Sequence, residues 1–401
     1  MDSRDLRNEI VNLINGKEKI TFADFMELAL YHPEYGYYTS KKEKIGKSGD
    51  YYTSSDVHPV FGELIARQLE QMWRLLGSNR FTVVEIGAGK GWLCHDILNY
   101  IRNEYPEFFG KIDYKIVEIS QNLIERQSNT IKGLEEKVSW ESFAEDGFSF
   151  NPIEGCFLSN EFFDSLPVHQ VIVKNNNLKE IYVTIKDDQF CEKVDELSSP
   201  ALRDYFNNLK IDLKEGQRAE VNLKMLEWVK NLSHYLNRGF VITIDYGHLA
   251  EELYSEERYR GTLMCYYEHT TNESPYEKVG NQDITSHVNF SSIMQEGTRL
   301  GLNTTGFVRQ SNFLIALGIL NKMNEAQGDI SKLLTMKNLF LPGGMVDVFK
   351  VLIQHKGIDN PELIGLRSMS EPGLAREIEA LRDKKQDSPQ RRRERRENHK
   401  E

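Results

Sequence analysis

Two short apolar runs, each followed by a helical pattern, dominate the first half of the chain. Phe81–Ile86 (FTVVEI) contains two consecutive valines, as expected of a strand that is buried on both faces of a parallel sheet. Three glycines follow it at alternate positions, and a helical pattern opens at Trp92. Tyr114–Ile119 is a second apolar run, with a helix predicted from near Ser120. This alternation predicts an α/β fold with a Rossmann-like parallel sheet.

Helical spacing of apolar residues also predicts an N-terminal helical region before these strands. Asp2–Asn15 and His58–Leu76 have this spacing, and Thr21 is the predicted N-cap of a helix between them, with Asp24 at the reciprocal position. The stretch up to Ser55 is rich in tyrosine, glycine, serine and lysine, with five tyrosines between positions 35 and 52. A long segment of this kind predicts a lid or binding loop.

The second half of the chain continues the α/β pattern with additions. Further sheet strands, a hairpin insertion and two helices are predicted, and a second loop region covers Gly261–Phe290. The strands are Cys156–Asn160 (the fourth parallel strand), Gly239–Tyr246 and Met345–Gln354, the hairpin is Val168–Lys174 with Leu178–Lys186, and the helices are Phe290–Leu300 and Gln310–Asn324.

The charge of the chain is unevenly distributed. The formal net charge is −11, but Asp383–Glu401 carries +3, which leaves −14 for the preceding residues. An acidic body repels the phosphates of nucleic acids, so we expect no nucleic-acid partner. A basic peptide or protein segment suits it better.

Compartment signals are few. The four cysteines are scattered, so neither a disulfide framework nor a metal site is expected, and a reducing cytosol fits. The longest apolar run, Phe313–Leu320, is too short to span a bilayer. The N-terminus resembles neither a signal nor a transit peptide. We therefore expect a cytoplasmic protein of bacterial type.

The C-terminal segment is expected to be dispensable. From Gly357 onward the apolar content falls, and Arg391–Arg396 is a run of charges. Such a segment buries too little apolar surface to offset the conformational entropy that it would lose on folding. Truncation before Asp383 should preserve the melting temperature and the turnover. A large loss of either would show that the basic tail docks on the acidic body.

The glycine turn after the first strand carries the main chemical signal. Glu85 precedes Gly87, Gly89 and Gly91, a G-x-G-x-G string that differs from the nicotinamide fingerprint G-x-G-x-x-G. Backbone N–H groups at such a turn can approach a ligand closely, although a turn without any ligand is the alternative. Glu118 ends the next strand, where an acid can accept both ribose hydroxyls of an adenosine group. Together they favour an adenosine-containing cofactor.

These and other motifs together resemble the MidA-like methyltransferases. Among these motifs, Glu-Phe-Phe-Asp-x-Leu-Pro is specific to that family, whereas the glycine string is shared by a whole superfamily. The resemblance runs from about Thr21 to Leu352. A departure is Val346-Asp347, where the family usually has Gly-Glu. The motifs are Gly49–Ser54 with Phe61-Gly62-Glu63, Glu85–Gly91, Val117–Ser120, Glu161–Asp164 with Leu166-Pro167, Asp245-Tyr246-Gly247, Asp283 with Thr285, and Phe349-Lys350.

The resemblance implies a function and a site. Mitochondrial members help to assemble respiratory complex I and are regarded as protein arginine methyltransferases, so the resemblance implies S-adenosylmethionine (SAM) as cofactor and an arginine of a complex I-type subunit as acceptor. It implies these site residues: for the cofactor Glu85, Gly87, Ala88, Gly89, Gly91, Glu118, Ile119 and Asn160; for the lid and substrate Gly49, Asp50, Thr53, Ser54, Asp283, Thr285 and His287; for catalysis Glu161 and Asp164.

The catalytic pair follows from the chemistry of arginine. Its guanidinium stays protonated in proteins, and carboxylates both bind its planar fork and favour proton loss. Glu161 and Asp164 lie three residues apart after a strand, and in a turn they could share one guanidinium. The alternative is that they cap the following helix and form local ion pairs.

The expected architecture has three parts. Residues 1–78 form a helical cap with the lid loop, and residues 79–358 form a seven-stranded methyltransferase domain with insertions at about 168–215 and 250–300. Residues 359–401 form a disordered basic tail. Two rival functions stay open: an assembly chaperone that binds SAM without turnover, and a small-molecule methyltransferase.

Overall fold

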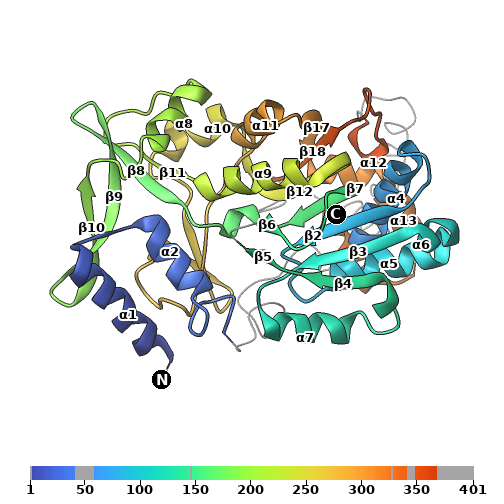
Figure 1. Ribbon diagram of the computed structural model, residues 1–401, viewed down its shortest axis with the longest axis horizontal. Helices are drawn as coiled ribbons and strands as arrows, with labels where there is room; N and C mark the ends of the chain where they lie inside the picture. The colour runs from blue at the N-terminus through green and yellow to red at the C-terminus, as the bar shows by residue number, and fades with distance from the viewer. Residues whose placement is uncertain (1, 41–57, 145–146, 327, 341–347, 368–401) are drawn as a thin grey trace, which may run out of the picture.

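One mixed sheet forms the centre of the molecule in the computed structural model, which describes residues 2–40, 58–144, 147–326, 328–340 and 348–367 (Figure 1). Its strands are β2 (Phe81–Ile86), β3 (Ile112–Val117), β4 (Val138–Glu141), β7 (Ile153–Asn160), β12 (Leu236–His248), β16 (Val288–Asn289), β17 (Asn303–Arg309) and β18 (Phe349–Lys356).

The order of these strands confirms the predicted fold class. It is β17-β18-β12-β7-β2-β3-β4, and the short β16 pairs with the end of β12. Neighbouring strands run parallel except at β18, which is antiparallel to both β12 and β17. β7 is the fourth of them along the chain, as predicted. The result is a mostly parallel Rossmann-like sheet.

Helices cover both faces of this sheet because successive strand residues point to opposite faces. Val83 and Leu158 belong to the core on one face, and Val84 and Phe157 belong to the core on the other. Helices of the first core are α4 (Val60–Leu75), α5 (Trp92–Glu104), α6 (Pro106–Lys111), α12 (Gln310–Ala316), α13 (Ile319–Glu325) and α14 (Ile330–Lys337). Those of the second are α9 (Leu223–Tyr235) and α11 (Phe290–Arg299), while α7 (Gln121–Thr130) follows β3.

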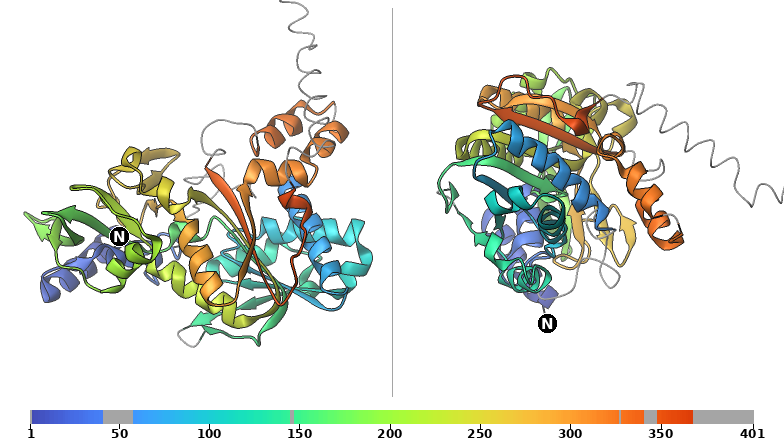
Figure 2. Two further views of the ribbon diagram at one scale, coloured as in Figure 1. Left: turned by 90° about the horizontal axis from the view of Figure 1, so that it is seen from above. Right: turned by 90° about the vertical axis from the view of Figure 1, so that its right-hand side faces the viewer.

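The N-terminal cap and the first insertion form a second body at the opposite end of the molecule from α4–α6 (Figures 1 and 2). Their sheet has the order β1-β9-β8-β11, and β10 also pairs with β9. Because β1 is N-terminal, the cap and the insertion share one sheet and one core, to which Phe25 and Val183 belong. The elements are α1 (Asp2–Lys17), β1 (Ile20–Thr21), α2 (Phe22–Tyr31), β8 (His169–Lys174), β9 (Asn177–Lys186), β10 (Gln189–Asp195), α8 (Ala201–Leu209) and β11 (Arg218–Val221).

Two local predictions in this body are confirmed. The side chain of Thr21 accepts a hydrogen bond from the backbone N–H of Asp24 (3.0 Å), so Thr21 caps α2. Asn175 and Asn176, with φ of 55° and 58°, connect β8 to β9 as a two-residue hairpin turn.

A third, small sheet lies in the second insertion. Its order is β14-β13-β15, and the chain leaves it to enter α11. Other short elements complete the description. They are β5 (Phe143–Ala144), β6 (Gly147–Phe148), α10 (Ala250–Leu253), β13 (Met264–Tyr267), β14 (Thr270–Asn272) and β15 (Asp283–Thr285). None of the helices in the described part of the chain is long and apolar enough to cross a membrane.

Three expectations about elements were wrong in detail. The helix predicted over Gln310–Asn324 is broken at Gly318, whose φ of 95° is left-handed. The edge strand β17 was not predicted, because its side chains are mostly half-exposed and lack a clear alternation. Residues 359–367, assigned to the tail, instead pack on α4: the N–H of Gly365 donates to Gln68 Oε1 at 2.9 Å. Residues 368–401 lie outside the described residues.

Candidate active site

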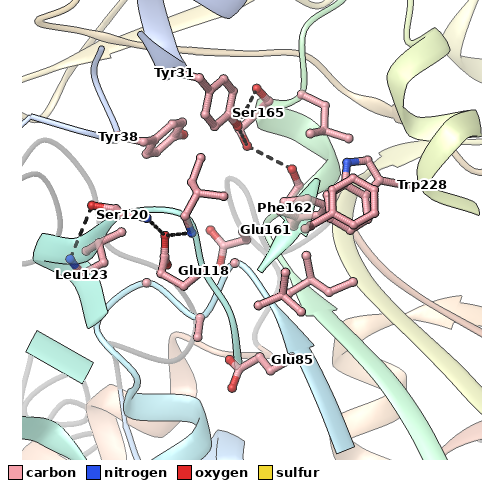
Figure 3. A pocket seen from close by; sticks show the side chains of 18 of the residues that line it. Tyr31, Tyr38, Glu85, Glu118, Ser120, Leu123, Glu161, Phe162, Ser165 and Trp228 are labelled. Carbon is pink, nitrogen blue, oxygen red and sulfur yellow. Dashed lines mark hydrogen bonds between the residues drawn. The ribbon is translucent and has the colours of Figure 1, made fainter. Parts of the chain in front are cut away.

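A pocket of about 650 Å³ opens at the carboxyl ends of β2, β3 and β7 (Figure 3). One side consists of the glycine turn after β2 and the acidic residue after β3. The other consists of side chains from α2, the residues after it, and α9. Open α/β sheets bind their ligands at this edge.

The glycine turn holds backbone conformations that other residues adopt at a cost. Gly87 and Gly89 line the pocket with φ of 72° and 52°. A Cβ on Gly87 would lie 2.9 Å from a ring carbon of Phe162. Gly91, with φ of 81°, is the N-cap of α5 and instead packs on Gln127 of α7. Gly87, Ala88 and Gly89 are therefore the part of the string that can contact a ligand.

Glu118 is fixed at the pocket by hydrogen bonds to both of its carboxylate oxygens. Its Oε1 accepts from the N–H groups of Ile119 and Ser120, each at 2.9 Å, and its Oε2 accepts from Gln127 Nε2 at 3.1 Å. Burial raises the pKa of Glu118, and these hydrogen bonds oppose that rise. The same Gln127 side chain donates to the carbonyl of Gly89 at 2.9 Å. One residue of α7 thus joins the two halves of the predicted cofactor site.

Glu85 and Asn160 lie deeper in the pocket. The Tyr114 hydroxyl donates to Glu85 Oε2 at 2.7 Å, and burial raises the pKa of Glu85 to about 7. Asn160 ends β7, and its Nδ2 donates to Glu161 Oε1 at 3.1 Å. Its Oδ1 is buried and has no hydrogen-bond partner among the described residues. That oxygen is free to accept from a donor on a bound ligand.

Glu161 reaches the pocket because β12 holds the loop that carries it. Its backbone is left-handed (φ 52°), and its N–H donates to the carbonyl of Ile244 at 2.9 Å. In the following turn, Asp245 Oδ2 accepts from the N–H groups of Phe162 (3.2 Å) and Phe163 (2.9 Å). Two consecutive residues of β12 thereby hold the backbone that carries the Glu161 side chain, which lies in the middle of the pocket in Figure 3.

Asp164 does not join Glu161 in the pocket, which corrects the expected shared fork. It is 5% exposed, lies behind the wall, and accepts a hydrogen bond from the Tyr246 hydroxyl. Residues three apart would face the same side only in a regular helix, and the left-handed Glu161 precedes the turn. Of the two carboxylates, Glu161 lines the pocket and Asp164 does not. The alternative of a helix cap with local ion pairs is not borne out for Asp164 among the described residues, because the partner of its side chain is the Tyr246 hydroxyl.

Burial of Asp164 predicts a pH effect on stability. Burial raises its pKa to about 6, whereas an unfolded aspartate has a pKa of about 3.9. The folded state therefore holds the proton more tightly, and the stability this gives is fully present below pH 4 and is lost as the pH rises through 6. Asp164→Asn mimics the protonated form. Urea unfolding at pH 4 and at pH 7.5 should show the variant gaining about 2–3 kcal/mol relative to wild type at the higher pH. A difference that does not change with pH would contradict this assignment.

The predicted substrate residues of the second insertion lie behind the pocket wall. Asp283 is 3% exposed and accepts from the Tyr38 hydroxyl at 2.7 Å, so it acts on the pocket through Tyr38. Thr285 is buried beside Tyr246. His287 packs on Tyr246 and His248, and burial lowers its pKa to about 4, so it stays neutral near pH 7. The four predicted lid residues, Gly49, Asp50, Thr53 and Ser54, lie outside the described residues.

Several aromatic residues of the pocket were not singled out from the sequence. Trp228 of α9 stacks on Phe143 (centroids 4.2 Å apart) and meets Phe162 edge-on. Tyr31 and Tyr38 line the side nearest the cap. The tyrosine-rich composition after α2 was a signal for Tyr38, but Trp228 lies on an amphipathic helix and has no sequence feature that distinguishes it from core.

The chain is similar to known methyltransferases over most of its length. The sequence pattern of a family of S-adenosyl-L-methionine-dependent methyltransferases matches residues 64–308. Protein arginine methyltransferase NDUFAF7, mitochondrial, of Rattus norvegicus is 29% identical over 330 residues, which cover 75% of this chain and 71% of the relative. The protein of the same name in Danio rerio is 26% identical over 395 residues, which cover 91% and 86%.

Solved structures show the same likeness. A COG1565 superfamily member from Burkholderia thailandensis, crystallised with S-adenosylhomocysteine, superposes with a TM-score of 0.82 at 29% identity, over 92% of this chain and 97% of that one. A native crystal structure of such a protein from the same organism gives a TM-score of 0.79. The likeness therefore includes the cap and the insertions as well as the central sheet.

The side chains of the pocket fit SAM as the cofactor. Glu118 offers a carboxylate to ribose hydroxyls, and the turn at Gly87 and Gly89 admits close approach. The Asn160 oxygen, which no described residue engages, can accept from an ammonium group. The match covers more than half of the chain, and the pocket lies where the fold places a ligand. The chain belongs to this family of SAM-dependent methyltransferases.

Proposed function

We propose that the enzyme methylates a guanidino nitrogen of an arginine in a protein. The observation that carries this proposal is the position of Glu161, a carboxylate fixed in the pocket beside the glycine turn. The acidic net charge of the body suits a basic protein segment. Several relatives bear the name protein arginine methyltransferase, which is consistent with this acceptor.

The role of Glu161 follows from the charge of the acceptor. A guanidinium is planar and fully protonated, so a carboxylate can bind it through charge-assisted hydrogen bonds and orient one nitrogen. As that nitrogen bonds to carbon it must lose a proton, and a nearby negative charge stabilises the change. Such help contributes about 10²–10⁴-fold in rate, and orientation of the acceptor adds to it.

The cofactor supplies an electrophilic methyl group on a sulfonium. With the cofactor bound, transfer of this methyl group to the acceptor nitrogen would leave S-adenosylhomocysteine, and the guanidinium proton would pass to Glu161 or to water. Glu161 thus holds the acceptor, and Asp245 and Ile244 hold Glu161.

We further propose a substrate and an organisation of the chain. The substrate is a subunit of a complex I-type dehydrogenase, and the protein acts in a bacterial cytoplasm. The cap consists of α1, β1 and α2, while α4 packs with residues 79–358, which form the catalytic domain with its insertions. The second rival, a small-molecule acceptor, is disfavoured by the size of the body that the cap and insertion build beside the pocket.

Labelling of a whole proteome tests the acceptor. Purified enzyme is incubated with isotopically labelled SAM and lysate from cells that lack this protein, and the labelled residues are mapped by mass spectrometry. Label on arginine of a few proteins is the expected result. Label on lysine, on nucleic acid or only on small molecules would contradict the arginine proposal. Absence of any transfer, even in a single turnover with SAM bound, would favour the chaperone alternative.

A further inference from the structure

Two tyrosines form a paired aromatic surface on the cap side of the pocket. Tyr31 is the last residue of α2, and Tyr38 follows seven residues later. Their rings pack together with centroids 5.4 Å apart and planes tilted by 34°. Both side chains line the pocket, and Figure 3 shows them on the side away from Glu85, with Glu161 between. They come from the cap and not from the sheet that carries the cofactor residues.

Hydrogen bonds fix the orientation of both rings. The hydroxyl of Tyr31 lies 3.1 Å from Ser165 Oγ and 3.2 Å from the carbonyl of Ser165, in the turn that follows Glu161. The hydroxyl of Tyr38 donates to the buried Asp283 at 2.7 Å. The Tyr31 hydroxyl is engaged by Ser165, another residue of the pocket, and the Tyr38 hydroxyl by the buried Asp283, so the aromatic rings are the part of these side chains left to contact a ligand.

Burial and the nearby carboxylates both oppose ionisation of the Tyr31 hydroxyl, so Tyr31 is not a general base at neutral pH. Burial raises its pKa well above 10, and the nearby charges of Asp283, Glu27 and Asp164 raise it further. Tyr31 therefore stays protonated at neutral pH. The same carboxylates make the surroundings of the aromatic pair negative, which attracts a cation to the ring faces.

We propose that Tyr31 and Tyr38 form the aromatic wall of the acceptor site, opposite Glu161, and make it selective for a planar guanidinium over an ammonium. This inference rests on the proposed arginine acceptor. A guanidinium stacks flat on an aromatic face while its edge binds a carboxylate, whereas a lysine ammonium is compact and strongly hydrated. Glu161 would bind the hydrogen-bonding edge of the guanidinium, and the two tyrosines would stack on its flat face.

Peptide binding measures this selectivity without turnover. The probe is a synthetic glycine–arginine repeat peptide, and the comparison is the same peptide with lysine, each titrated by calorimetry into protein saturated with S-adenosylhomocysteine. Wild type should bind the arginine peptide more tightly. Tyr38→Leu should weaken arginine-peptide binding by about 2- to 30-fold and move the arginine-to-lysine ratio towards one. Tyr38→Phe keeps the ring and should keep the ratio.

The controls separate the possible failures. Tyr35→Leu is a matched change in the same segment, since Tyr35 stacks on His32 outside the pocket, and it should leave the ratio unchanged. Affinity for S-adenosylhomocysteine should be the same in all variants. If Tyr38→Leu lost as much affinity for S-adenosylhomocysteine as for the arginine peptide, the ring would contact the cofactor and the inference would be overturned. A wild-type preference that survives Tyr38→Leu would overturn only the aromatic wall. A wild type without preference would count against the arginine acceptor itself.

Discussion

Replacement of Glu161 by glutamine is expected to remove most methyl transfer to arginine while SAM binding stays nearly unchanged. Glutamine keeps the size of the side chain and an oxygen that can accept from Asn160 Nδ2, so the loop held by Ile244 and Asp245 should not move. Only the charge is lost. A charge that matters mainly in the transition state affects turnover more than binding, so we expect a decrease of about 10²–10⁴-fold in kcat.

The measurement combines two assays on one protein. Calorimetry gives the SAM affinity, and incorporation of labelled methyl into mapped arginines gives the rate. Glu154→Gln is the matched control: Glu154 lies at the opposite end of the same strand β7, is exposed, and should behave as wild type in both assays. Equal arginine labelling by Glu161→Gln would show that the proposed role of Glu161 is wrong, although the fold and the cofactor site would be unaffected.

The cofactor half of the site was predictable because it is local in sequence. A buried strand, a glycine turn, a helix, a second strand and an acid follow one another within 40 residues, and each has its own pattern. The parallel pairing of β2 with β3 then brings Gly87 and Glu118 to the same edge without any long-range information. The resemblance of motifs added the family, and the specific site residues on this edge remain predictions for mutagenesis.

The acceptor half depends on contacts between distant segments, which no periodicity encodes. Glu161 and Asp164 look equivalent in sequence, but contacts with residues more than 80 positions later distinguish them. Asp245 holds the turn after Glu161, which lies in the pocket, and Tyr246 binds Asp164 behind the pocket wall. Tyr38 acquires its orientation from Asp283, 245 residues away. Pairing of β1 with β9 likewise joins a predicted cap to a predicted insertion. Each of these requires the folded chain.

Replacement of Gly89 by valine is expected to abolish detectable SAM binding in a protein that stays folded. Gly89 lines the pocket with φ of 52°, and its carbonyl is held by Gln127, which also binds Glu118. A β-branched side chain there is strained in the left-handed conformation by about 1–2 kcal/mol. It also occupies the space in which a ligand would contact the protein backbone of the turn. Strain alone lowers stability, whereas lost space lowers affinity.

A second glycine separates these two effects. Gly133, with φ of 84°, lies in the turn between α7 and β4, and a Cβ there would meet no atom within 4 Å. Gly133→Val carries similar backbone strain without touching the pocket, so its melting temperature should fall about as much as that of Gly89→Val while its SAM affinity, measured by calorimetry, stays that of wild type. If Gly89→Val also remains folded and binds SAM as wild type does, the glycine turn is not the cofactor site. The ligand would then have to approach from the α9 side of the pocket, where Trp228 and Asn231 line the wall.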